Sequence, residues 1–266
     1  MKFAIKLNIA KLRSFFRKNK IINNLYEKPI VVVIPSYNNA LWYKKNLDSI
    51  FNQKYSNYRI IYIDDASQDD TSFYVQGYVD SLGYKSKLTL IRNEKRSGAT
   101  ANRYLGSHLA NDEEIVIILD GDDWLAQDYV FQIINSTYST EDVWLTYGQF
   151  IRWPSGVEGQ CKFLEQDYDF RSMDQWYTSA LRTYYAWLFK KIKKSDLMLD
   201  GDFIDVAGDV AEMLPMLEMA RGHIKFVDEI LYVYNVQTNF NDFKVNSEKQ
   251  RKITQLIKSR QRYDNL

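Results

Sequence analysis

Clustered aspartates follow two apolar segments of this chain, and they are the residues best suited to chemistry. Each apolar segment and its aspartates are seen in IIYIDDASQDDT at residues 60–71 and IVIILDGDDW at residues 115–124. Neighbouring carboxylates repel one another unless a cation lies among them or a ligand donates hydrogen bonds to them. The Asp-x-Asp spacing of Asp120 and Asp122 suits Mg²⁺ or Mn²⁺, which take oxygen ligands and complete their shell with water and substrate phosphates.

The elements around these aspartates alternate between strand and helix. Short, β-branched apolar runs predict buried strands at residues 30–34, 59–63, 87–92 and 115–119. Apolar residues at helical spacing predict a helix between each pair of strands. This order predicts an α/β fold with a mostly parallel, Rossmann-like sheet that helices cover on both faces.

Three polar clusters directly follow strands of that sheet. They are Pro35-Ser36-Tyr37, Asp64-Asp65 and Asp120-Gly121-Asp122-Asp123. In open parallel sheets, ligands bind beyond the carboxyl ends of the strands. We therefore expect all three clusters to line the same edge of the sheet.

The second half of the sequence is less regular. We expect a strand at residues 144–153, an amphipathic helix at 179–192, a helix at 210–220 despite Pro215, two short strands within 224–235, and a terminal helix from residue 245. No linker separates the two halves, so the sequence predicts a single continuous domain.

Composition excludes several classes of protein. A formal charge of +1 over 266 residues argues against a nucleic-acid binder, and the single cysteine, Cys161, excludes an internal disulfide framework. One cysteine also fits a reducing compartment, so we expect a cytoplasmic protein. Nothing approaches 18 consecutive apolar residues, so no membrane-spanning helix is expected.

The first 20 residues carry seven Lys or Arg and no acidic residue, with apolar residues between them. This pattern leaves two interpretations open. The segment is either a basic amphipathic helix that lies on an anionic membrane surface or an arm that packs on the domain. We assign residues 1–28 to this N-terminal arm.

Four blocks of the sequence resemble the nucleotide-sugar half of family 2 glycosyltransferases, which have the GT-A fold. The blocks are VVVIPSYNNALWYKKNLDSIFNQ, YIDDASQDDT, RNEKRSGATANRYLG and ILDGDDWL, and they occur in the family's order. The resemblance implies a nucleotide-sugar-binding half at residues 29–127, an acceptor-binding half at 128–243 and a C-terminal helix at 244–266. It also implies a nucleotide-sugar donor, a glycan or other glycoconjugate acceptor, and Mn²⁺ or Mg²⁺ as cofactor.

The resemblance further implies roles for individual donor-site residues. Pro35, Ser36 and Tyr37 match the loop that lies against the nucleotide base. Asp65 matches the carboxylate that hydrogen-bonds a uracil ring, which favours a UDP-sugar.

Arg103 occupies the slot of the family's arginine near the diphosphate, although Tyr104 stands where the family usually has Asn. Around the Asp-x-Asp pair, Asp120 matches the residue that faces the ribose and Asp122 the residue that holds the metal on the diphosphate. Gly121 lies between them, and Trp124 follows the cluster closely enough to border the site.

A transferase of this kind also needs a base that removes the proton of the acceptor hydroxyl. The family's late aspartate matches Asp209, in AGDVAEMLPMLEMA, although the usual preceding Glu is replaced by Gly208. Asp205 and Glu212 are the nearest alternatives. The resemblance implies a single in-line displacement that inverts the anomeric centre. No Gln/Arg-x-x-Arg-Trp motif of processive synthases occurs, so we expect one sugar to be added per acceptor.

Two other functions fit part of the pattern. Haloacid-dehalogenase-like phosphatases also have Asp-x-Asp after a strand, but their motif has Thr or Val two positions after the second Asp. Trp124 occupies that position here. The other alternative is a non-catalytic domain that binds a nucleotide sugar or scaffolds a membrane complex through the basic N-terminus.

Overall fold

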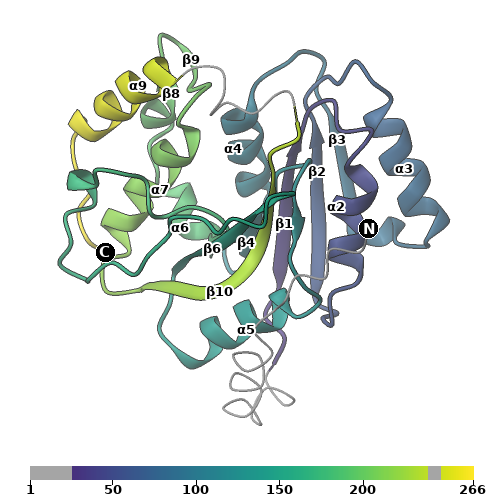
Figure 1. Cartoon of the computed structure of the whole chain (residues 1–266), viewed down its shortest axis with the longest axis horizontal. Helices are drawn as coiled ribbons and strands as arrows, with labels where there is room; N and C mark the ends of the chain where they lie inside the picture. The colour runs from purple at the N-terminus through teal and green to yellow at the C-terminus, as the bar shows by residue number, and fades with distance from the viewer. Residues whose placement is uncertain (1–25, 239–246) are drawn as a thin grey trace.

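The computed structural model describes residues 26–238 and 247–266 (Figure 1). One eight-stranded sheet, in the order β3-β2-β1-β4-β7-β6-β10-β5, runs through the molecule, and helices pack on both of its faces. The α/β fold and the single continuous domain are therefore confirmed. The basic segment at residues 1–20 lies outside the described residues. Over the ranges that the structure describes, no helix is long and apolar enough to cross a membrane.

The first half of the chain forms the parallel part of the sheet. Its strands are β1 (Ile30–Ser36), β2 (Tyr58–Asp64), β3 (Leu88–Arg92) and β4 (Ile115–Ile118). Its helices are α2 (Tyr43–Phe51), α3 (Thr71–Ser81) and α4 (Ala99–Leu109), with a 3-10 turn η2 (Lys85–Lys87). β1 pairs in parallel with β2 and β4, and β2 with β3, as the alternating pattern predicted.

The second half of the chain extends the same sheet. Its strands are β5 (Trp124–Leu125), β6 (Leu145–Trp153), β7 (Arg182–Tyr185) and β10 (Ile224–Asn235), with a separate hairpin of β8 (Met198–Leu199) and β9 (Asp202–Phe203). Its helices are α5 (Val130–Thr140), α6 (Ala186–Lys190), α7 (Gly208–Met219) and α9 (Ser247–Ser259), with 3-10 turns η3 (Phe170–Ser172) and η4 (Lys194–Leu197). β7 runs antiparallel to its neighbours β4 and β6, while β10 is parallel to β6 and antiparallel to β5.

Three expectations for this half were wrong in part. The helix expected at 179–192 begins only at Ala186, because Arg182–Tyr185 pairs as a strand between β4 and β6 and the β-forming residues Thr183 and Tyr184 suit that position. The two strands expected within 224–235 are one bulged strand, β10. The terminal helix ends at Ser259, and residues 260–266 continue without helical structure.

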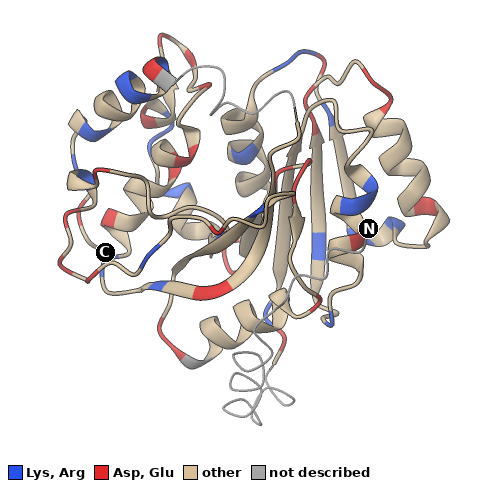
Figure 2. Ribbon diagram, viewed as in Figure 1, with Lys and Arg blue, Asp and Glu red and all other residues tan. Residues whose placement is uncertain are grey.

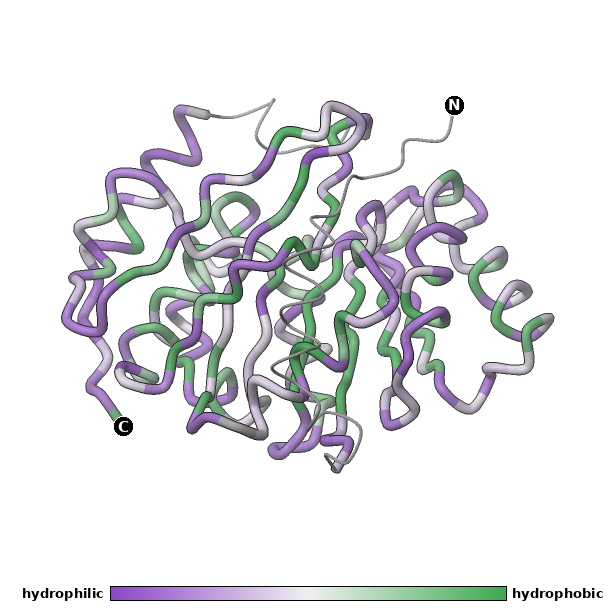
Figure 3. The backbone as a smooth tube through the Cα atoms, turned by 60° about the horizontal axis from the view of Figure 1, so that its bottom comes forward, coloured by the Kyte–Doolittle hydropathy of each residue, from purple (hydrophilic) through white to green (hydrophobic). Residues whose placement is uncertain are grey.

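The core lies on both faces of the sheet. β1 is buried along its whole length because its side chains alternate between a cluster with α2, α3 and α5 and a cluster with α4, α6 and α7. Figure 3 shows the hydrophobic segments concentrated in these central strands. Each fully buried Val or Ile stabilises the fold by about 1.5–3 kcal/mol.

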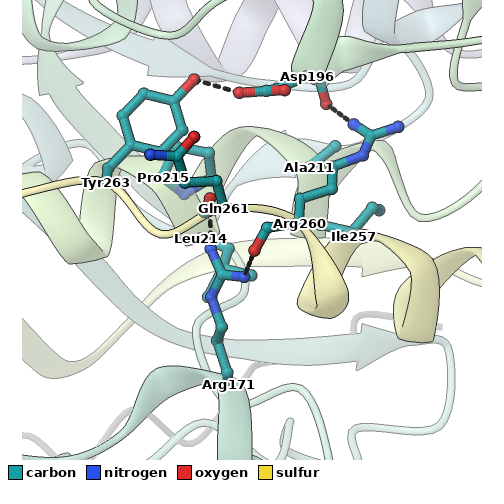
Figure 4. Close-up of a pocket in the computed structure, with 9 residues that line it drawn as sticks. All are labelled: Arg171, Asp196, Ala211, Leu214, Pro215, Ile257, Arg260, Gln261 and Tyr263. Carbon is teal, nitrogen blue, oxygen red and sulfur yellow. Dashed lines mark hydrogen bonds between the residues drawn. The ribbon is translucent and has the colours of Figure 1, made fainter.

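Arg171 holds the C-terminal segment against α7 (Figure 4). Its guanidinium donates to the buried carboxylate of Glu218 (2.6 and 3.0 Å) and to the carbonyl oxygens of Lys258, in the last turn of α9, and of Arg260 and Gln261 just beyond it. A cation at a helix C-terminus satisfies carbonyl groups that have no partner within the helix. The cavity between these side chains has a volume of only about 10 Å³, so it is a packing defect and not a ligand site.

Candidate active site

The carboxyl ends of β1, β2 and β4 bring the three predicted polar clusters to one edge of the sheet. The amide of Asp65 donates to the carbonyl of Ser36 (2.8 Å), and the amide of Gly121 donates to that of Pro35 (3.0 Å). The two acidic clusters therefore flank the loop after β1, and Figure 2 shows acidic residues at this end of the sheet. We call this edge the acidic rim.

Gly121 allows the close approach between β4 and β1 at the rim. A Cβ atom at this position would lie 2.6 Å from Ser36 Oγ and 2.7 Å from Asn39 Nδ2. Both of those groups are buried, and Asn39 Nδ2 donates to Ser36 Oγ (2.9 Å). A side chain at Gly121 would therefore displace the rim.

Asp65 is a buried carboxylate that already accepts three hydrogen bonds. The donors are Asn93 Nδ2 (2.7 Å), the amide of Ser97 (2.8 Å) and the amide of Gly98 (2.8 Å). The last two amides lead into α4, so Asp65 holds the start of that helix against the rim. Nearby, the guanidinium of Arg96 lies 4.1 Å from the ring centroid of Tyr37.

The three aspartates after β4 have different environments. The Asp120 side chain is one-third exposed (33%) and Asp122 is half-buried, so both open to solvent at the rim. Asp123 is 1% exposed, and it accepts hydrogen bonds from the Tyr232 hydroxyl and from the amide of Asn235 (2.7 Å). Burial, together with the charges of Asp122 and Asp120, raises the pKa of Asp123 well above its usual range despite these bonds. Asp123 therefore stabilises the turn that Asp120, Gly121, Asp122 and Asp123 form after β4.

Two asparagines fix the backbone of the same turn. Asn46 Nδ2 donates to the carbonyls of Asp120 (3.0 Å) and Asp123 (2.8 Å), and Asn235 Nδ2 donates to that of Asp122 (3.1 Å). Sequence reasoning missed both asparagines. The only signal for Asn46 is a polar residue beside Leu47 on the buried face of α2.

A buried ion pair joins the two halves of the chain beside the rim. Arg103 Nε, on α4, lies 2.8 and 3.0 Å from the carboxylate oxygens of Glu212, on α7, and Arg103 Nη1 lies 3.7 Å from Asp120 Oδ1. Burial alone would lower the pKa of Arg103, but the carboxylates of Glu212, Asp120 and Asp209 outweigh it and raise that pKa. Arg103 is thus a cation held between the rim and α7.

Asp209 lies in the first turn of α7, and its charge is one of those that raise the pKa of Arg103. The helix can approach α4 there because residue 208 is glycine: a Cβ atom would overlap Thr100 Oγ1 and lie 2.7 Å from Arg103 Nη2. Close packing of α7 on α4 therefore explains why residue 208 is glycine and not the family's usual Glu. Asp209 is half-buried and keeps access to solvent.

The two alternatives to Asp209 have other partners. Asp205 is exposed and forms an ion pair with Lys249 of α9. Glu212 is 1% exposed, and both of its oxygens are bound by Arg103. Of the three carboxylates, Asp209 combines an electrostatic effect on Arg103 with solvent access.

Trp124 packs in an aromatic cluster next to the rim. Its ring centroid lies 6.5 Å from that of Trp42 and 5.4 Å from that of Trp153, and Lys45 Nζ lies 3.3 Å from the Trp124 ring centroid. Trp124 is 7% exposed. The cluster shields most of the ring, and contact between Trp124 and a ligand stays a prediction.

The chemistry of Asp120 and Asp122 fits Mg²⁺ or Mn²⁺. Both are hard oxygen donors that reach solvent beside each other. Within residues 26–238 and 247–266, no group of three His, Cys, Asp or Glu side chains is placed to hold a metal. The pair of Asp120 and Asp122 suits a cation that substrate phosphates and water also coordinate.

A second cavity, of about 310 Å³, lies at the amino ends of β6 and β10, away from the rim. Its lining includes Glu141, Phe163, His223 and Lys225. Ligands of open α/β sheets bind at the carboxyl ends of strands, so we place the candidate site at the acidic rim and not in this cavity.

Comparison with known sequences identifies a family for this chain. The sequence model of the family described as "Glycosyl transferase family 2" matches residues 31–178, more than half of the chain. The chain belongs to glycosyl transferase family 2. The matched range contains the whole acidic rim and Arg103, while α7 with Asp209 lies beyond it. Family membership sets the phosphatase alternative aside.

Curated relatives of this family 2 chain match it over part of its length. UDP-Glc:alpha-D-GlcNAc-diphosphoundecaprenol beta-1,3-glucosyltransferase WfgD of Escherichia coli is 27% identical over 46% of this chain and 45% of its own length. Glycosyltransferase GlyA of Streptococcus pneumoniae is 29% identical over 40% of this chain and 14% of its own length. The chain thus spans less than half of either relative.

Solved structures of glycosyltransferases share the fold. TarS of S. aureus, residues 1–349 in complex with UDP-GlcNAc, superposes with a TM-score of 0.65 at 17% identity, over 86% of this chain and 65% of that one. The mannosyltransferase PcManGT of Pyrobaculum calidifontis, in complex with GDP-Man and Mn²⁺, gives 0.57 at 16% identity, over 87% and 66%. The expected GT-A type of fold is confirmed.

Proposed function

We propose that this family 2 protein is a metal-dependent, inverting glycosyltransferase. It moves one sugar from a nucleotide sugar, a UDP-sugar by preference, to a hydroxyl of a glycan or glycoconjugate. The observation that supports this proposal is the position of Arg103, which lies 3.7 Å from Asp120 and whose pKa is raised in part by the charge of Asp209. These residues come from separate elements and meet where the family's donor and acceptor sites would adjoin.

The donor would bind along the acidic rim. Pro35, Ser36 and Tyr37 form the loop against which the nucleotide base would lie, with Asp65 beside it. Asp65 keeps unused oxygen lone pairs, because a carboxylate has about four acceptor sites and three are occupied here. A uracil ring N–H suits such an acceptor, which favours UDP.

The diphosphate would lie over Asp120 and Asp122, with Arg103 beside it. Asp122, with Asp120, would hold Mn²⁺ or Mg²⁺, which when bound offsets the negative charge of the departing diphosphate. Arg103 is positioned by Glu212, so its charge is fixed next to Asp120 before the substrate arrives. The Mn²⁺ complex of PcManGT is consistent with a divalent ion in this fold.

Asp209 would act as the base. Its carboxylate would accept the proton of the acceptor hydroxyl as that oxygen attacks the anomeric carbon, and the bond from that carbon to the diphosphate would break on the opposite side. Attack opposite the leaving group inverts the anomeric centre. A positioned carboxylate contributes roughly 10²–10⁴-fold to such a step.

The relatives support a role in glycan assembly. WfgD is named as a glucosyltransferase that uses UDP-Glc and a diphosphoundecaprenol-linked sugar. TarS has been crystallised with UDP-GlcNAc. We infer the same classes of substrate here, a nucleotide sugar and a glycoconjugate, and one transfer per acceptor.

Replacement of Asp209 tests the proposal and its non-catalytic alternative together. With a panel of UDP-sugars and Mn²⁺, Asp209→Asn should lower UDP release by roughly 10²-fold or more, whereas UDP binding measured by calorimetry should be retained. Asp205→Asn is the matched control, because Asp205 is exposed and paired with Lys249. It should leave turnover within twofold of wild type. Equal turnover in Asp209→Asn and wild type would remove Asp209 from the reaction.

A further inference from the structure

Buried polar atoms without a partner concentrate in the short segment that leads into β7. More than half of those found among the described residues belong to positions 176–182: Trp176 Nε1, Thr178 Oγ1, and Nε and Nη1 of Arg182. Arg182 is 7% exposed. A buried guanidinium with unused donors is costly in a folded protein unless a ligand supplies the acceptors.

The sheet register places Arg182 next to the acidic rim. Arg182 is the first residue of β7 and pairs with Ile118, two residues before Asp120. Side chains alternate along the strand. The Thr183 hydroxyl bonds that of Tyr138 on α5 (2.9 Å), and the Tyr184 hydroxyl bonds that of Ser107 on α4 (2.9 Å). Arg182 therefore shares the α4 side with Tyr184, which is also the side of Arg103 and α7.

The nearby buried carboxylate does not satisfy Arg182. Burial raises the pKa of Glu212, and Arg103 and Arg182 both oppose that rise, so Glu212 lies within electrostatic reach of both arginines. Its two oxygens, however, are hydrogen-bonded by Arg103. Two buried guanidinium groups thus share one buried carboxylate, and Nε and Nη1 of Arg182 have no acceptor.

We propose that Arg182 is an anion-binding residue of the substrate cleft and that its guanidinium binds a phosphate oxygen of a bound substrate. A planar guanidinium offers paired N–H donors that match phosphate oxygens. The phosphate has two potential sources, the diphosphate of the donor and a phosphate carried by the acceptor. This inference rests on the proposed function, and it adds a phosphate contact from the acceptor half of the chain.

Binding measurements on Arg182→Gln and Arg182→Lys test the inference. Calorimetry with Mn²⁺ gives the affinity for UDP and for uridine, and NMR titration gives the affinity of the UDP-saturated protein for inorganic phosphate. Arg59→Gln is the matched control, because Arg59 pairs with Glu114 near the amino end of β2, far along the strand from the rim.

A donor contact predicts that Arg182→Gln binds UDP at least tenfold more weakly while uridine binding is unchanged. An acceptor contact predicts unchanged UDP binding and at least tenfold weaker binding of inorganic phosphate. Arg182→Lys should show a smaller loss of the same probe, because lysine keeps the charge but not the paired donors. Arg59→Gln should change neither affinity.

Three results would overturn the inference. They are unchanged affinity for both phosphate probes, an equal loss for UDP and uridine, and failure of both Arg182 variants to fold, which would assign Arg182 to the core. Wild-type protein that binds no UDP with Mn²⁺ would instead contradict the proposed function itself.

Discussion

Individual carboxylates at the edges of the sheet differ because of what surrounds them. Asp123 and Glu212 are buried and bonded, whereas Asp120, Asp122 and Asp209 keep access to solvent. Buried carboxylates with full partners support structure, and accessible ones can be reached by a metal ion or a proton. The acidic motif therefore contains two kinds of residue that its sequence does not distinguish.

Glu114 offers a pH test of this reasoning at a residue outside the site. Burial would raise the pKa of Glu114, but Arg59, the amide of Asn111 and Lys190 together lower it. A lowered folded-state pKa gives stability that is present above the unfolded value, about 4.3, and is lost as pH falls through the folded value.

We expect Arg59→Gln to lower the free energy of unfolding by about 1–2 kcal/mol at pH 7, allowing for the solvent around the guanidinium. The difference from wild type should shrink as pH falls below about 4.3, because Glu114 then becomes neutral in the unfolded chain and in the variant. Urea titrations at pH 7, 5 and 3.5 measure it. A difference that is independent of pH would show that the pair acts through packing alone.

At the scale of elements, close helix–strand contacts position the rim. α4 packs on β1 at Gly106, where a Cβ atom would overlap the side chain of Val33. The same helix carries Arg103 on its buried side and begins at the amides bound by Asp65. A shift of α4 would therefore move several site residues together.

Gly106→Ala should destabilise the fold by about 1–3 kcal/mol in urea titrations, because the added methyl group forces α4 away from β1. Gly77→Ala on α3 is the matched control. It has open space around its Cβ position, so helix propensity should stabilise that variant by about 0.5–1 kcal/mol. Stabilisation by both substitutions would show that α4 does not pack as closely as described.

The C-terminal segment depends on Arg171. Arg171→Ala removes the ion-pair partner of the buried Glu218 carboxylate and the donor to the carbonyls at the end of α9, so we expect a loss of about 3–5 kcal/mol in unfolding free energy. Arg262→Ala, which removes an exposed ion pair with Asp169 in the same segment, is the control and should have little effect. Equal unfolding midpoints for the two variants would mean that Arg171 does not anchor this segment.

At the scale of the whole molecule, the parallel half of the sheet and its acidic edge were predictable, because the signals are local. Each strand is a short apolar run, and each aspartate cluster follows one directly. The strand β7 was not predictable, because its partners β4 and β6, and not its own helical spacing, decide its structure. The ion pair between Arg103 and Glu212 joins residues 109 positions apart, and no local pattern connects them.

The same difference, between local sequence signals and contacts made only in the folded chain, applies to the residues of the site. Asp65, Asp120 and Asp122 follow strands and Pro35 lies at the end of β1, so their positions could be predicted from the sequence. Arg182 could not be predicted from the sequence, because the evidence for its role is that Nε and Nη1 have no partner in the folded chain. Such a property appears only when every neighbouring group has been placed.

Shared binding of a divalent cation and a diphosphate at the acidic rim is the central feature of the proposed function. Calorimetric titration of UDP with and without Mn²⁺, on wild type and Asp122→Asn, tests this directly. We predict that Mn²⁺ strengthens UDP binding to the wild type at least tenfold and that Asp122→Asn abolishes the gain while metal-free UDP affinity stays within threefold. Equal UDP affinity in the presence and absence of Mn²⁺ for the wild type would contradict the account.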